Sequence, residues 1–98
     1  MLTAITRAVS ASLAHGELTF RERAPIDVPL ARRQHDGYER ALASLGVRID
    51  HLAAEDAMAD AVFVEDIAIV LDEIAIVTTP GALSRRGETE SIARAVAR

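Results

Sequence analysis

One long helical stretch between two short runs of strand-forming residues constrains the fold of this chain most. Asp27 can cap this helix with its carboxylate, Pro29 fits its first turn, and Gly46 supplies its stop. An apolar face at helical spacing is predicted from Leu30, Tyr38, Ala41, Leu42 and Leu45. The flanking runs 2–7 and 47–52 are typical of strands. The sequence therefore predicts an α/β fold.

Two further apolar runs, Ile67–Leu71 and Ile74–Thr78, are separated by the dipeptide Asp72-Glu73. Two strand-like runs joined by two polar residues predict a β-hairpin, although this turn lacks the usual Gly. Pro80-Gly81 ends the second strand. The chain thus continues with a second element of sheet after the strand–helix–strand unit.

The last segment, "SRRGETESIARAVAR", is predicted to be a helix with Ser84 as its cap. No Gly, Asn or Pro stops this helix before Arg98. We therefore expect the domain in residues 1–98 to be cut in its last helix.

Composition excludes several classes of function. Ninety-eight residues form one domain at most, and the net charge of −4 disfavours nucleic acid as a partner. The absence of cysteine excludes disulfides and a cysteine nucleophile within this chain. The longest apolar stretch is too short for a membrane span, and no secretory signal is visible. We expect a cytoplasmic protein with neither membrane nor nucleic acid as partner.

Cofactor motifs are also missing from the sequence. No GxGxxG or P-loop pattern supports nucleotide binding, and no HExxH pattern occurs. His15, His35 and His51 lie at no spacing typical of a zinc site. The sequence therefore predicts no metal and no cofactor.

Three carboxylates, Asp60, Glu65 and Asp66, precede the first hairpin strand. If a strand begins near residue 64, Glu65 and Asp66 point to opposite faces. One interpretation is a solvated junction between a loop and a strand, because charged runs usually face solvent. The other is a pocket for a cation, and a planar guanidinium suits it best because carboxylates accept its parallel N–H groups.

Arg85 and Arg86 offer the opposite charge at the start of the last helix. They can be an exposed pair, or they can bind the carboxylate of a ligand. Cations near a helix N-terminus are mildly unfavourable, which indicates another task for this pair. We expect the acidic and basic clusters to flank one cavity.

Four segments together resemble a known family: "TRAVSASLAHGELTF", "PIDVPLARRQHDGYERALASLG", "VFVED" and "PGALSRRGE". They resemble, in order, the N-terminal part of the dimethylarginine dimethylaminohydrolases (dimethylargininases) of the amidinotransferase superfamily. The resemblance implies a pentein fold, a five-bladed α/β-propeller, of which this chain would hold about two blades. It also implies a cytoplasmic, cofactor-free hydrolase that converts asymmetric dimethylarginine and monomethylarginine to citrulline and a methylamine.

The resemblance also implies a set of substrate-binding residues. Asp66 would bind the substrate guanidinium, and Arg85 would pair with the α-carboxylate. Glu65 and Asp60 would also line the guanidinium pocket, and Phe63 would form its apolar wall. Leu18 would contact the amino-acid end through its main chain. The sequence departs from the family pattern at Ala61, Ile67 and Thr79.

The family's catalytic groups are a C-terminal Cys nucleophile and a mid-chain His, and neither has a counterpart in this chain. The resemblance thus implies no catalytic residue here, and whether this chain is itself an enzyme stays open. One alternative is a non-enzymatic module that self-associates or binds a partner through open propeller edges, or weakly binds guanidino ligands. Another is a part of a different arginine-modifying pentein, of the arginine deiminase or amidinotransferase type.

Overall fold

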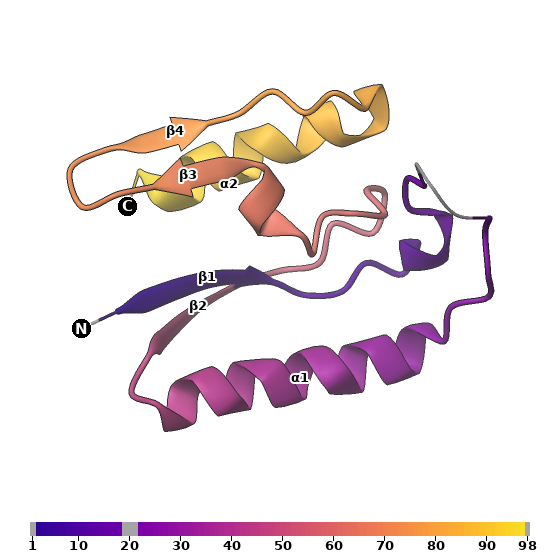
Figure 1. Ribbon diagram of the computed structural model, residues 1–98, viewed down its shortest axis with the longest axis horizontal. Helices are drawn as coiled ribbons and strands as arrows, with labels where there is room; N and C mark the ends of the chain where they lie inside the picture. The colour runs from indigo at the N-terminus through magenta and orange to yellow at the C-terminus, as the bar shows by residue number, and fades with distance from the viewer. Residues whose placement is uncertain (1, 19–21, 98) are drawn as a thin grey trace.

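The first half of the chain is a β-α-β unit. The computed structural model describes residues 2–18 and 22–97. Strand β1 (Thr3–Arg7), helix α1 (Val28–Ser44) and strand β2 (Arg48–Leu52) follow one another. β1 and β2 pair in parallel, and α1 runs along one side of this pair (Figure 1). Parallel neighbours need a crossover connection, and α1 supplies it.

The ends of α1 confirm the local signals in the sequence. The Asp27 side chain accepts a hydrogen bond from the Leu30 N–H at 3.0 Å, and Pro29 lies in the first turn. Gly46 follows the helix with a φ of 85°, a conformation that glycine adopts without steric penalty. The chain can therefore turn back directly into β2.

The second half is an antiparallel hairpin followed by a helix. Strands β3 (Ala68–Val70) and β4 (Ala75–Val77) pair with Ala68 opposite Val77. Helix α2 (Thr89–Val96) lies behind the hairpin and contacts β4 (Figure 1). The predicted hairpin is confirmed, although its regular strands are shorter than the apolar runs. No strand begins near residue 64, because Val64–Asp66 form a 3-10 helix, so the condition that would point Glu65 and Asp66 to opposite faces is not met.

The last helix begins later than the sequence predicts. Leu83–Glu88 form a 3-10 helix, and the α-helical part starts at Thr89. Ser84 caps neither segment, and its hydroxyl donates to the Glu17 carboxylate instead. The predicted cap is therefore wrong. Arg98, at the predicted end of the helix, lies outside the described residues.

A small core and one buried arginine join the two halves. The buried apolar side chains are Val9, Ala61, Ile67, Ile92 and Ala95. Arg7 is only 4% exposed and donates to the Ala53 carbonyl at 2.7 Å and to the Ser91 hydroxyl of α2. Since β1 carries Arg7 and α2 carries Ser91, this side chain ties the first unit to the last helix.

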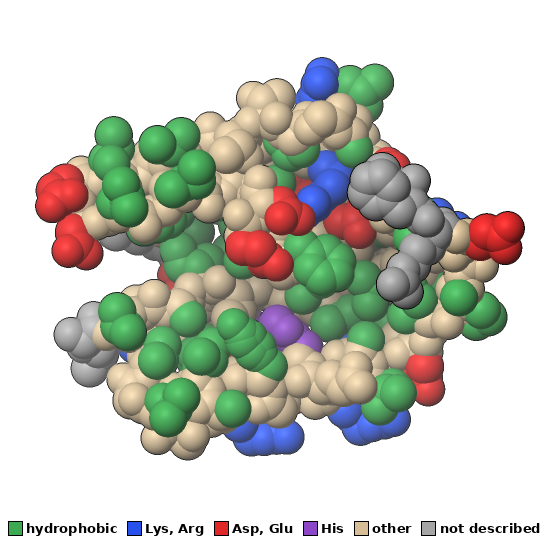
Figure 2. Space-filling view, viewed as in Figure 1, with side chains coloured by type: hydrophobic (Ala, Val, Ile, Leu, Met, Phe, Trp, Pro, Cys, Tyr) green, Lys and Arg blue, Asp and Glu red, His purple; other side chains and the backbone are tan. Residues whose placement is uncertain are grey.

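Two apolar surfaces remain uncovered among the described residues. The first lies on α1 and the second on the hairpin, where Figure 2 shows a group of apolar side chains. Their exposed members are Leu30 and Tyr38 on α1 with Leu45 just after it, and Ile69, Val70, Leu71, Ile74, Ile76 and Val77 on the hairpin. The side of α1 that is half-buried carries Val28, Ala31, His35, Glu39 and Leu42.

The predicted apolar face of α1 is therefore largely exposed, because a two-stranded sheet is too narrow to cover more than one flank of the helix. Only Leu42 belongs to both the predicted face and the half-buried one. Within the ranges that the structure describes, no helix has both the length and the apolar character of a membrane span.

Candidate functional site

Three of the predicted site residues lie in a series of tight turns. The Phe63 N–H donates to the Asp60 carbonyl at 3.0 Å, and the Asp66 N–H donates to the Phe63 carbonyl at 3.2 Å. These hydrogen bonds close two successive turns, and the second leads into the 3-10 helix Val64–Asp66. The turns therefore keep the Asp60 and Phe63 carbonyls near Asp66.

Arg85 lies against these turns. Its Nη1 donates to Asp66 Oδ2 at 2.7 Å, and its Nη2 reaches the Asp60 and Phe63 carbonyls at 3.0 and 3.3 Å. We expected the acidic and basic clusters on opposite sides of a cavity, but the structure joins Arg85 and Asp66 directly. Figure 2 shows acidic and basic side chains in contact on this face.

Glu88 holds the other edge of the Arg85 guanidinium. Nε and Nη2 of Arg85 each donate to one Glu88 oxygen at 2.9 Å, which is the bidentate geometry of strong ion pairs. Glu88 is only 3% exposed. Hydrogen bonds to Glu88, and then to Asp66, raise the pKa of Arg85 above its ordinary value although burial opposes its charge. Arg85 is therefore a fixed cation.

Sequence reasoning missed Glu88, although a signal was present. Glu88 follows Arg85 by three residues within "SRRGE", and residues at this spacing share one side of a helix. Arg86, by contrast, turns away and donates to the Pro80 carbonyl at 3.0 Å. Only the first arginine of the pair belongs to this cluster.

The loop that carries Leu18 is attached to the site through Asp60. The Asp60 carboxylate accepts a hydrogen bond from the Glu17 N–H at 2.8 Å. A Cβ atom on Gly16 would lie 2.4 Å from Asp60 Oδ1, so glycine allows this close approach. Leu18 follows Glu17 in the sequence and its side chain is half-exposed. Residues 19–21, which follow it, lie outside the described residues.

The predicted site residues line two different hollows. Phe63 and Glu65 line a hollow of about 580 Å³ between the two halves of the molecule. Asp60 and Arg85 line a smaller hollow of about 200 Å³, together with Glu88. Among the described residues, Glu65 has no hydrogen-bond or ion-pair partner, and the Asp66 side chain is 53% exposed. The carboxylates on this face are therefore accessible to a cationic ligand.

The chemistry of this arrangement is binding and orientation. Asp66 and the neighbouring carbonyls already accept the N–H groups of one guanidinium, that of Arg85. The sequence has no thiol to attack a guanidinium carbon. The site can therefore hold a planar cation beside a fixed positive charge.

Comparisons with known proteins place this geometry in context. No protein-family model matches the chain. It is 42% identical over 95 residues to an N(G),N(G)-dimethylarginine dimethylaminohydrolase of Streptomyces coelicolor, and 43% identical over 94 residues to that of Pseudomonas aeruginosa. These matches cover 97% and 96% of this chain, which spans about 37% of the length of either relative.

Solved structures agree with the sequence matches. A cysteine-to-serine mutant of the Pseudomonas aeruginosa enzyme complexed with citrulline superposes with a TM-score of 0.90 at 41% identity. A dimethylarginine dimethylaminohydrolase with a histidine-to-glycine substitution, in an adduct with S-methyl-L-thiocitrulline, gives the same values. Each match covers 97% of this chain and 37% of the other. The chain is therefore related, in sequence and in its pentein-type α/β fold, to the N-terminal part of the dimethylarginine dimethylaminohydrolase family.

Proposed function

We propose that this chain supplies the substrate-holding part of a cytoplasmic enzyme that hydrolyses asymmetric dimethylarginine and monomethylarginine to citrulline and a methylamine. The observation that carries the proposal is the contact of Asp66 with a guanidinium, that of Arg85, on a chain related to dimethylargininases. A carboxylate that already accepts hydrogen bonds from one planar cation has the chemistry needed for another.

Binding on this proposal is an exchange of ion-pair partners. The substrate guanidinium takes the place of Arg85 on Asp66, and the substrate α-carboxylate takes the place of Asp66 on Arg85. Each charge keeps a partner of opposite sign, so neither is left unpaired. Glu88 stays bound to Arg85 throughout, because its bidentate contact lies on the other edge of the guanidinium. A ligand that carries both charges completes the exchange, whereas a small guanidine replaces Arg85 on Asp66 only.

The remaining site residues receive supporting roles. The main chain of Leu18 contacts the amino-acid end of the substrate, and Asp60, which holds the Leu18 loop through Glu17, lines the guanidinium pocket. Phe63 forms the apolar wall of the larger hollow, and Glu65 supplies a carboxylate there. These assignments follow the family resemblance.

Catalysis requires groups that these 98 residues do not contain. A guanidinium carbon is shielded by delocalised positive charge, and a carboxylate that stabilises the bound cation does not accelerate the chemical step. The thiol nucleophile and the acid/base histidine of the family would come from a further segment of polypeptide.

A citrulline assay tests this proposal. We expect no citrulline from dimethylarginine with the purified chain alone, and turnover when a segment that carries the family's Cys and His is added. Turnover by the chain alone, after rigorous removal of contaminating enzyme, would contradict the missing-nucleophile argument. Absence of turnover in a well-folded complemented protein would contradict the proposed function.

We also propose that the two sheets belong to about two blades of a five-bladed propeller. The exposed apolar faces of α1 and the hairpin are surfaces that neighbouring blades would cover. The chain alone should then self-associate. Sedimentation at roughly tens of micromolar chain should detect oligomers, and a compact monomer would count against the two-blade proposal.

A further inference from the structure

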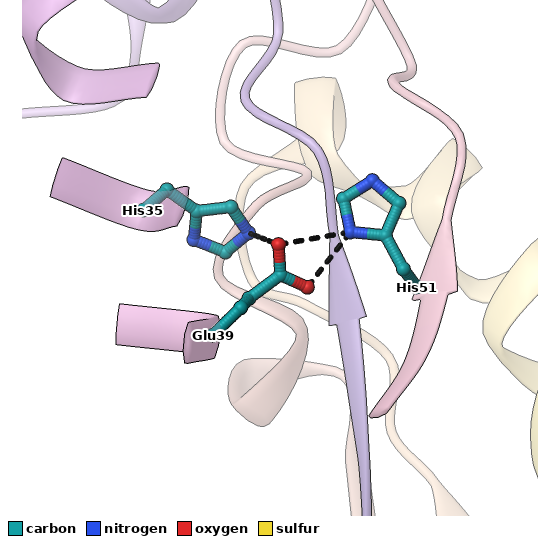
Figure 3. Close-up of side chains that lie close together, drawn as sticks. All are labelled: His35, Glu39 and His51. Atoms are coloured by element: carbon teal, nitrogen blue, oxygen red, sulfur yellow. Dashed lines mark hydrogen bonds and ion pairs between the residues drawn. The ribbon is translucent and has the colours of Figure 1, made fainter. Parts of the chain in front are cut away.

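A second cluster of ionisable side chains lies between α1 and β2, away from Arg85. His35 and Glu39 come from α1, and His51 comes from β2. His51 Nδ1 lies 2.7 Å from Glu39 Oε2, and His35 Nε2 lies 3.8 Å from Glu39 Oε1. Figure 3 shows both imidazole rings with a nitrogen directed at the carboxylate. One donor atom from each residue lies within 4.8 Å of the other two.

His35 Nε2 is an unsatisfied atom. In the part of the chain that the structure describes, it is the one buried side-chain nitrogen or oxygen without a hydrogen-bond partner. Buried polar atoms in folded proteins almost always have a partner, and an exception calls for a water or an ion. The separation of 3.8 Å from Glu39 is too long for a hydrogen bond but leaves room for a small ion between the two atoms.

The charges around the cluster favour a cation. The adjoining hollow of about 270 Å³ is lined by the two histidines, by Asp36 and Asp56, and by a single cation, Arg32. The acidic groups therefore outnumber the permanent cation around the two rings.

We propose that His35, Glu39 and His51 form a binding site for a zinc ion. Two imidazoles and one carboxylate are a donor set that zinc prefers, with a fourth position for water. Ligands about 2.0–2.1 Å from a tetrahedral zinc lie about 3.3 Å apart. Glu39 Oε1 lies 3.0 Å from His51 Nδ1 and 3.8 Å from His35 Nε2, on either side of this value, so small movements of the three side chains complete the geometry.

The fourth position faces water, because the His51 side chain is 45% exposed while those of His35 and Glu39 are 15% and 13% exposed. This access also gives the ion a path of entry. A metal at this point joins α1 to β2, so binding should stabilise the β-α-β unit.

Zinc titration calorimetry of the full chain, freed of metal by a chelator and held near neutral pH, tests the site. We expect one zinc ion per chain and a higher Tm with zinc. His51→Ala should weaken binding by at least about tenfold, because it removes a ligand. Since His51 is half-exposed, this substitution spares the core. His15→Ala is the matched control, because His15 is the third histidine of the sequence and lies outside the cluster.

A second measurement on the unmodified chain does not depend on the folding of a variant. Zinc should shift the NMR ring resonances of His35 and His51 and leave those of His15 unchanged. Absence of saturable binding, binding that His51→Ala leaves intact, or a shift confined to His15 would each overturn the proposal.

Discussion

The Arg85 cluster and the His35–Glu39–His51 cluster differ in how completely their polar atoms are paired. Arg85 donates to two carboxylates and two carbonyls, and Glu88 is almost fully buried against it. In the other cluster Glu39 accepts from Thr6 and His51, yet His35 Nε2 has no hydrogen-bond partner among the described residues.

This difference in pairing predicts that the two clusters bind different kinds of ligand. A paired cluster binds a ligand only by exchanging partners, which favours a ligand that carries both charges. A cluster with an unpaired nitrogen can bind a metal ion without losing an existing contact. The following substitutions test whether the two clusters really differ in this way.

Removal of the buried partner of Arg85 should have the largest effect on stability. Glu88→Gln leaves Arg85 with a weaker neutral partner in a buried position, so the free energy of unfolding should fall by about 3 kcal/mol. Urea denaturation measures this loss. Glu90→Gln is the matched control, because Glu90 pairs with Arg94 in the same segment but both side chains are exposed. The control should change stability by less than about 0.5 kcal/mol.

A methyl group at Gly16 should disturb the paired cluster through Asp60. Its Cβ would lie 2.4 Å from Asp60 Oδ1, so the carboxylate or the loop must move. We expect Gly16→Ala to lower the free energy of unfolding by about 1–2 kcal/mol. Gly81→Ala is the control, since no atom lies within 4 Å of its added Cβ and its φ is not positive. Equal stability of the two variants would show that the Gly16–Asp60 approach is not tight.

The smallest effect is expected in the histidine cluster. Thr6→Val removes the hydroxyl that donates to Glu39, so the free energy of unfolding should fall by about 1 kcal/mol. Thr3→Val, on the exposed end of the same strand, should be close to neutral. A loss as large as that of Glu88→Gln would mean that Glu39 is held as firmly as Arg85, and would remove the distinction between the clusters.

Much of the fold could be predicted because its signals are local. Asp27 and Gly46 fix the two ends of α1 by interactions within a few residues, and the Asp72-Glu73 break marks the hairpin. The 3-10 turn at Val64–Asp66 was missed, because "VFVED" also fits the start of a strand. Which side of α1 is buried depends on tertiary packing, and the sequence pattern alone indicated the exposed side.

The sequence predicted which residues belong to the candidate site but not how these residues contact one another. The resemblance selected Asp66 and Arg85, but their direct pairing depends on how the two 3-10 segments meet in space. The histidine cluster escaped sequence reasoning for a similar reason. His35 and Glu39 are four residues apart on one helix, but His51 joins them only through the packing of α1 on β2.

The most direct test of the central claim compares the binding of dimethylarginine with that of a small methylguanidine. The protein tested is this chain completed by the segment of a relative that carries the Cys and the His. The claim is that Asp66 holds a guanidinium while Arg85 holds a carboxylate. Asp66→Asn should weaken dimethylarginine and a small methylguanidine alike, by roughly 2–4 kcal/mol. The double substitution Arg85→Met with Glu88→Leu, which leaves neither buried charge unpaired, should weaken dimethylarginine but spare the methylguanidine. Equal losses for both ligands in the double variant would contradict the account.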